Sequence, residues 1–169
     1  MIYETFQELK LSALGMGCMR LPQGDAYADI NVPEVKRMVA LAMEKGVNYY
    51  DTAWGYHDGN SERVMGEVLS AYPRENFYLA TKFPGYDLSN MGKVKEIFEE
   101  QLERCRVDYF DFYLFHNVCE MNIEQYLDPK YGIFEYLMEQ KKNGRIRHLG
   151  FSCHGNLPVL KRFLEAYGR

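Results

Sequence analysis

Four side chains with different acid–base chemistry stand at or just after the ends of apolar segments. Asp51 ends VNYYD, Lys82 ends FYLATK and His116 ends YFDFYLFH, while Tyr56 follows Asp51 within DTAWGYHDGN. An ammonium group close to a phenol stabilises the phenolate, and a carboxylate beside the ammonium keeps it charged and oriented. A neutral imidazole can donate a hydrogen bond to a carbonyl oxygen. If the four side chains converge, they can move a proton to or from a carbonyl oxygen.

This set predicts that Tyr56 donates a proton to a carbonyl oxygen while the carbonyl carbon receives a hydride. In the reverse direction the same residue accepts a proton from an alcohol. No side chain delivers a hydride, so the reaction needs a redox cofactor. We therefore expect an oxidoreductase that acts on small carbonyl compounds.

Segments that we expect to be strands alternate along the chain with segments that we expect to be helices. We expect strands at residues 11–21, 47–51, 77–82, 109–116 and 147–152. Apolar residues at helical spacing predict helices at about 31–46, 61–72, 93–105, 133–143 and from 156 onward. Asn31 and Ser61 are the expected N-caps of the first two helices. This alternation favours an α/β fold with a parallel sheet of about five βα units.

The carboxyl ends of parallel strands converge on one face of such a fold, and function gathers there. Asp51, Lys82 and His116 are therefore expected to face one another, together with Ser152 at the end of the fifth strand. Each residue alone has an ordinary explanation: a loop cap, a solvated lysine or a core histidine. Their joint position at successive strand ends favours a catalytic site.

Five segments carry a resemblance to a known family. They are, in chain order, LGMGCMRLP, GVNYYDTAWGYHDGNSERVMGEVL, YLATKF, YFDFYLFHNV and GRIRHLGFSCHG. Together they resemble the N-terminal part of an aldo-keto reductase, a (β/α)8-barrel family of nicotinamide-dependent carbonyl reductases. The GCMRLP and FSCHG segments look most like a bacterial branch. Longer members of that branch can carry an iron–sulfur domain, for which this chain has no cysteine cluster.

The resemblance implies a role for each candidate residue. Asp51, Tyr56, Lys82 and His116 match the catalytic tetrad of the family, with Tyr56 as the general acid and base. Ser152 matches a residue that helps to hold the nicotinamide carboxamide, and Asp51 is also expected at the cofactor. The implied cofactor is NADP(H) or NAD(H), and the implied substrate is a small-molecule carbonyl compound.

The chain departs from the family pattern in two ways. Ser152, Cys153 and His154 stand where family members commonly have Ser-Asn. The sequence also stops after the fifth βα unit, whereas an eight-stranded barrel takes about 250 residues. The phosphate-binding segments of the family belong to the seventh and eighth units. We therefore expect residues 1–169 to form one incomplete TIM-barrel domain, a fragment of the full barrel.

An incomplete barrel leaves two sheet edges unpaired and exposes apolar residues that closure would bury. The open edges favour self-association, or completion of the sheet by a partner chain. The incomplete barrel also allows an alternative interpretation, in which the chain is a catalytically silent half-barrel. Such a remnant would act at most as a partner-binding or redox-sensing module.

Composition and charge limit the remaining classes of protein. Of the residues, 47% are hydrophobic and 26% are charged, which is typical of a globular domain. The net charge is -4 and the basic residues are dispersed, so we expect no nucleic acid partner. No apolar run approaches the ~20 residues of a spanning helix, and no signal peptide is evident. We therefore expect a cytoplasmic protein without a membrane partner.

Several residues near the candidate site have competing interpretations. Trp54 is expected to wall the substrate pocket, with simple loop packing as the alternative. Glu62 begins a helix, where the helix dipole favours an acid, so we expect a structural role. Cys153 and His154 are adjacent on a strand and point to opposite faces, so we expect no metal site. The four cysteines are far apart, which favours reduced, structural thiols.

Overall fold

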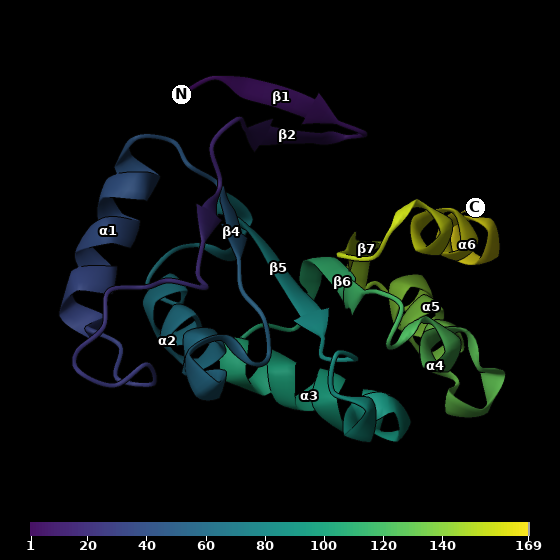
Figure 1. Ribbon diagram of the computed structural model, residues 1–169. Coiled ribbons are helices and arrows are strands. Elements are labelled where there is room, and N and C mark those ends of the chain that lie inside the picture. Colours follow the sequence, from purple (N-terminus) through teal and green to yellow (C-terminus); the bar gives the residue numbers. More distant parts are fainter. Residues whose placement is uncertain (169) are drawn as a thin grey trace.

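The computed structural model describes residues 1–168, which form two sheets and a set of helices (Figure 1). An antiparallel hairpin at the N-terminus pairs β1 (Tyr3–Phe6) with β2 (Leu9–Ser12). The main sheet is parallel, and its five strands follow one another in chain order. They are β3 (Met16–Gly17), β4 (Tyr49–Asp51), β5 (Tyr78–Phe83), β6 (Phe110–Val118) and β7 (Ile146–Cys153).

The helices lie along the outer side of the main sheet, and the hairpin lies on its other side (Figure 1). The α-helices are α1 (Val32–Glu44), α2 (Asn60–Leu69), α3 (Val94–Cys105), α4 (Ile123–Leu127), α5 (Ile133–Lys142) and α6 (Leu157–Tyr167). Short 3-10 turns are η1 (Tyr56–Gly59), η2 (Arg74–Asn76), η3 (Leu88–Lys93) and η4 (Pro129–Tyr131). The predicted α/β fold with five parallel strands, an incomplete TIM barrel, is confirmed. Arg169, the last residue of the expected domain, lies outside the described residues.

Two local predictions are wrong. Residues 11–21 do not form one buried strand, because Leu9–Ser12 turns away to pair with the N-terminal strand and leaves a two-residue β3. Ser61 does not cap the second helix. The N-cap is Gly59 in the left-handed region at φ 90°, while Ser61 lies buried inside α2 and donates to the Cys18 carbonyl oxygen. Asn31 does cap α1, accepting from the Glu34 amide at 3.1 Å.

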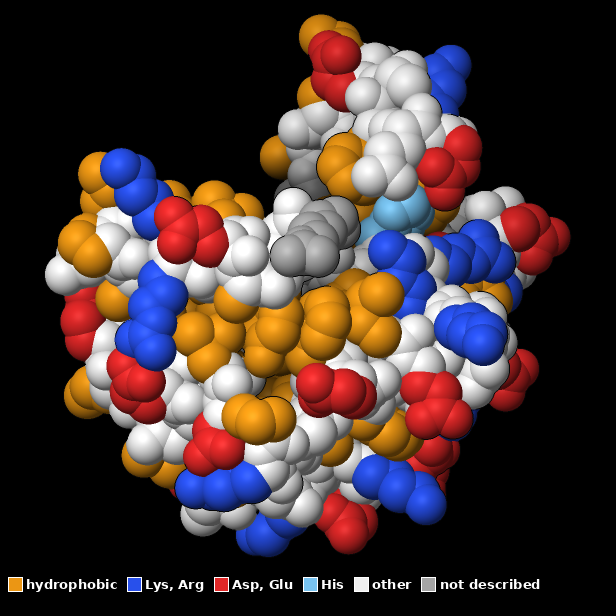
Figure 2. Space-filling model, turned by 90° about the vertical axis from the view of Figure 1, so that its right-hand side faces the viewer, with side chains coloured by type: hydrophobic (Ala, Val, Ile, Leu, Met, Phe, Trp, Pro, Cys, Tyr) orange, Lys and Arg blue, Asp and Glu red, His pale blue; other side chains and the backbone are white. Residues whose placement is uncertain are grey.

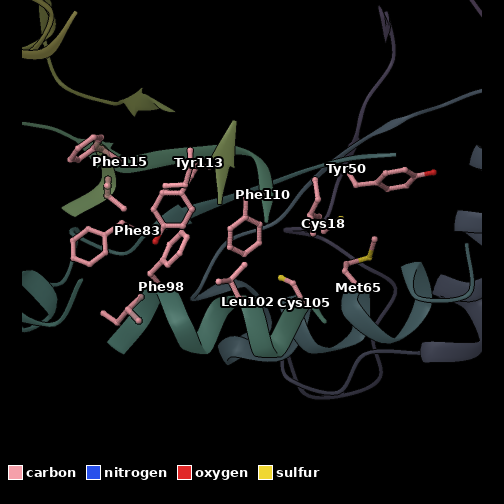
Figure 3. Close-up of a cluster of buried hydrophobic side chains, with 14 of the residues drawn as sticks. Cys18, Tyr50, Met65, Phe83, Phe98, Leu102, Cys105, Phe110, Tyr113 and Phe115 are labelled. Carbon is pink, nitrogen blue, oxygen red and sulfur yellow. The ribbon is translucent and has the colours of Figure 1, made fainter. Parts of the chain in front are cut away.

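Side-chain alternation along the strands separates the core from the candidate site. Phe83, Tyr113 and Phe115 are fully or almost fully buried in the cluster between the sheet and the helices (Figure 3). Lys82 directly precedes Phe83 and His116 directly follows Phe115 in the chain, so both point to the opposite, inner face. The aromatic core thus fixes the orientation of these two polar side chains.

The two edges of the main sheet carry apolar hollows. Within residues 1–168, β3 and β7 each pair with another strand on one side only. A cavity of about 580 Å³ lies beside β7, with a lining that includes Phe134, Met138, Leu149, Phe151 and Phe163. A second, of about 360 Å³, lies beside β3 and includes Leu14, Met16, Met38 and Leu41. Figure 2 shows hydrophobic side chains gathered near the middle of the face on the α5 and α6 side.

None of the helices between residues 1 and 168 has the length and apolar character needed to cross a bilayer.

Close packing of α2 on α3 depends on Gly66. A Cβ atom at this position would lie 2.7 Å from the Cys105 carbonyl carbon, so the Gly66→Ala substitution must push the two helices apart. We predict a loss of about 1 to 3 kcal/mol in the free energy of unfolding, measured by urea denaturation. The control Gly92→Ala faces open space and should change this value by less than about 0.5 kcal/mol. Equal effects of the two substitutions would contradict the packing described.

Candidate active site

The Lys82 ammonium is the centre of the candidate site. Its side chain is nearly buried and donates to Asp51 Oδ1 at 2.6 Å and to the Thr52 carbonyl oxygen at 2.7 Å. The third contact is the Tyr56 hydroxyl at 3.3 Å. An ammonium group has three donors, and these three acceptors use all of them. The structure therefore brings Asp51, Tyr56 and Lys82 together as the sequence predicted.

Tyr56 lies in η1, immediately after the loop that follows β4. Its ring centroid is 4.9 Å from Lys82 Nζ and 5.9 Å from the His116 ring. The two residues after it, His57 and Asp58, both have positive φ, at 52° and 53°. The chain is therefore tightly turned just beyond the phenol.

The buried ring of His57 holds this turn in place. Its Nε2 accepts from the Leu21 amide at 3.0 Å, and its Nδ1 lies 2.6 Å from the Tyr27 carbonyl oxygen. With Nε2 as acceptor, Nδ1 carries the proton and donates to Tyr27. The ring also stacks on the Tyr27 side chain at 4.5 Å. Sequence reasoning missed His57, because its partners are backbone atoms of a distant loop.

His116 completes the predicted tetrad. Burial, followed by the nearby charges of Lys82 and His154, lowers the pKa of His116 from 6.5 to about 4. The imidazole is therefore neutral near pH 7 and can donate one N–H. Its Nδ1 is buried and has no hydrogen-bond partner within residues 1–168. The Tyr86 ring, which the sequence did not single out, packs edge-on against it at 5.2 Å.

Ser152 lies near the end of β7, and its Oγ accepts from the Asn117 amide at 2.8 Å. That bond uses an oxygen lone pair and leaves the hydroxyl hydrogen available as a donor. A carboxamide oxygen is a suitable acceptor, so this residue fits the nicotinamide end of the implied cofactor. Across the described residues, 1–168, no three His, Cys, Asp or Glu side chains are placed to hold a metal ion.

Trp54 and Glu62 both contact Arg104. The guanidinium lies 3.6 Å from the centroid of the Trp54 ring and 3.3 Å from Glu62 Oε2. One side of the indole therefore stacks on α3, and its expected role as a pocket wall stays a prediction. Glu62 lies in the first turn of α2 and is fully buried. The helix-dipole argument did not anticipate this burial.

A strand-end site of this kind on a parallel α/β sheet is typical of barrel enzymes. A model of the aldo/keto reductase family matches residues 13–163. The chain belongs to the aldo/keto reductase family.

Individual relatives are similar to this chain in sequence, and a solved structure is similar to it in fold. The probable aldo-keto reductase 1 of Glycine max is 32% identical over 158 residues, covering 86% of this chain and 42% of that protein. The NADH-specific methylglyoxal reductase of Escherichia coli is 27% identical, covering 85% and 48%. A solved aldo-keto reductase from Bacillus halodurans aligns with a TM-score of 0.74 at 28% identity, covering 94% and 51%. The chain thus spans about half the length of the curated relatives that it matches.

The lowered pKa of His116 predicts a pH-dependent loss of stability. The unfolded chain takes up this proton near pH 6.5 and the folded chain only near pH 4. The free energy of unfolding should therefore fall as the pH is lowered between these values. Allowing for partial exposure, His116 should account for about 1 to 2 kcal/mol of the loss between about pH 7 and pH 5.

The His116→Gln variant isolates this effect, because glutamine does not titrate. Urea denaturation at the two pH values should show a smaller loss for the variant than for the wild-type chain. Identical losses would contradict a neutral, buried imidazole.

Proposed function

We propose that this chain carries the catalytic half of a nicotinamide-dependent carbonyl reductase, in which Tyr56 is the general acid and base. The observation that supports the proposal best is the Lys82 ammonium, which contacts Asp51, the Thr52 carbonyl oxygen and the Tyr56 hydroxyl together. A positive charge fixed beside a phenol stabilises the phenolate that is left when the proton is transferred. That is the property a proton donor to a carbonyl oxygen requires.

Each residue of the site has a separate task in this proposal. Tyr56 donates its proton to the carbonyl oxygen of the substrate, and Lys82 stabilises the phenolate that remains. Asp51 keeps the ammonium charged and oriented. His116, neutral near pH 7, donates an N–H to the same carbonyl oxygen and orients the substrate. Trp54 is proposed to wall the substrate pocket.

A nicotinamide cofactor supplies the hydride when it is bound. Ser152 is proposed to hold its carboxamide, and Asp51 to lie beside it. Relatives differ in cofactor, since the Escherichia coli enzyme is named for NADH and a Klebsiella pneumoniae structure with the same fold was solved with NADP. We therefore propose NADP(H) or NAD(H) for this chain. Small aldehydes and ketones are the proposed substrates.

The Tyr56→Phe substitution tests this proposal. It removes the proton donor and keeps the ring, so NADPH or NADH oxidation with a panel of aldehydes should slow by at least about 100-fold. Tyr3→Phe, on the N-terminal hairpin, removes a phenol outside the site and should leave the rate unchanged. Equal rates for Tyr56→Phe and the wild-type chain would remove Tyr56 from the mechanism.

The open edges of the sheet favour a second candidate, a catalytically silent half-barrel that binds another chain. In this candidate the apolar hollows beside β3 and β7 are docking surfaces, and a second copy of the chain is the proposed occupant. A redox-sensing role would require cofactor binding without turnover. Calorimetry with NADPH separates the candidates, since the silent form should bind no nucleotide.

Self-association can be measured directly by native mass spectrometry and size-exclusion chromatography. The wild-type chain should form species larger than a monomer. Met138→Glu places a charge in the hollow beside β7 and should shift the population toward monomer. Met121→Glu is the matched control, because Met121 is 77% exposed and lies outside both hollows. A stable wild-type monomer with bound nucleotide would contradict this second candidate.

A further inference from the structure

Glu62, in the first turn of α2, carries a buried carboxylate that the proposed reaction does not use. Its Oε1 accepts from Thr81 Oγ1 at 2.6 Å and from Gln101 Nε2 at 2.7 Å. Its Oε2 accepts from Arg104 at 3.3 Å. Thr81 points to the helix side of β5, while the adjacent Lys82 points to the inner face. The carboxylate therefore lies behind the sheet, directly across from the candidate site.

Two of these partners connect Glu62 to the backbone of the site. The Gln101 amide also donates to the Lys82 carbonyl oxygen at 3.1 Å. The Arg104 guanidinium also donates to the Trp54 carbonyl oxygen at 3.5 Å and stacks on the Trp54 ring. Glu62 therefore contacts β5 directly through Thr81, and Gln101 links it to the backbone of Lys82 itself. Arg104 links it to the loop that leads to Tyr56.

The orientation of the Gln101 amide is fixed independently. The hydroxyl of Tyr113, a fully buried residue of β6, donates to Gln101 Oε1 at 2.6 Å. The nitrogen must then face Glu62 and the Lys82 carbonyl oxygen. The network accordingly joins α2, α3, β5 and β6 through four fully buried side chains, those of Glu62, Thr81, Gln101 and Tyr113.

The neighbouring residue of α2 adds a further connection. Ser61 Oγ donates to the Cys18 carbonyl oxygen at 2.9 Å and lies 2.9 Å from Thr52 Oγ1. Because Ser61 has one hydroxyl hydrogen, Thr52 is the donor in the second contact. Thr52 in turn offers its carbonyl oxygen to the Lys82 ammonium. The first turn of α2 thus contacts the residues that directly follow β3 and β4, and also β5.

A buried charge is an expensive way to anchor a helix. Burial raises the pKa of Glu62 above its usual value, and the hydrogen bonds from Thr81, Gln101 and Arg104 counteract only part of this effect. Apolar side chains of similar volume commonly replace buried ion pairs without loss of stability. Stability alone therefore does not account for an acid at this position. The directional hydrogen bonds of the acid, which lead toward the Lys82 strand and toward the loop before Tyr56, do account for it.

We propose that Glu62 is a positioning residue, which holds the Lys82 strand and the Tyr56 loop at the separation that lets the ammonium reach the phenol. The inference rests on the proposed function, because it assigns a purpose to the contact between Lys82 and Tyr56. Glu62 acts through Gln101 and Arg104 and does not itself touch the reacting groups.

The substitution Glu62→Gln keeps the size of the side chain and removes its charge, so it weakens the bond from Arg104. Glu67→Gln is the matched control on the same helix, since Glu67 is only partly buried and pairs with Lys36 at 2.6 Å, away from the site. The first readout is the 13Cζ resonance of Tyr56 in chain labelled at tyrosine, identified by its absence from Tyr56→Phe. We expect Glu62→Gln to move this resonance and Glu67→Gln to leave it in place.

The second readout is steady-state reduction of an aldehyde. Misplacement of a reacting group by a fraction of an ångström slows the chemical step, so kcat should fall about 10- to 100-fold while KM changes by less than about 2-fold. Under Glu67→Gln both constants should stay at the wild-type values. A KM effect without a kcat effect would contradict a positioning role.

The two readouts separate the inference from the proposed function. If no carbonyl compound is turned over by the wild-type chain, the proposed function fails and the Tyr56 resonance alone decides the role of Glu62. An unmoved resonance in folded Glu62→Gln overturns the inference. If that variant does not fold, Gln101→Met is measured instead, since it removes the bond to the Lys82 carbonyl oxygen, and the same shift is expected.

Discussion

A nearly buried ammonium group imposes the strictest requirement on this structure. Lys82 is 5% exposed, and a charge in that position is tolerated only when each of its N–H groups has an acceptor. Asp51, the Thr52 carbonyl oxygen and the Tyr56 hydroxyl are those acceptors. The end of β4, the loop after it and the strand β5 must therefore meet at one point. The hydrogen bonds of Ser61, Glu62 and His57 each constrain one of these segments.

The fold meets this requirement through simple strand geometry. Large aromatic side chains fill the space between the sheet and the helices (Figure 3). Their sequence neighbours are forced to the inner face, where Lys82 and His116 lie on β5 and β6. The tetrad uses only β4, the loop after β4, β5 and β6. These four residues thus lie away from the outer edges of β3 and β7, which pair with no other strand within residues 1–168.

Sequence reasoning was most successful where one strong physical rule decides the structure. Parallel strands end on one face, and this rule places Asp51, Lys82 and His116 on the same face of β4, β5 and β6. It failed where tertiary contacts override local pattern. The glycine-rich segment at residues 11–21 looks like one strand but is divided by hairpin pairing. Ser61 has the chemistry of a cap but bonds to distant backbone, and Glu62 depends on partners more than ten residues away in the chain.

The Lys82 ammonium can be examined without relying on turnover. Its 15Nζ signal in lysine-labelled chain is identified by comparison with Lys82→Met, and the exchange rate of its protons with water is measured near neutral pH. Three hydrogen bonds and near-complete burial predict that the protons of this group exchange far more slowly than those of exposed lysines such as Lys36. Exchange as fast as that of an exposed lysine would contradict the account of how this site is built.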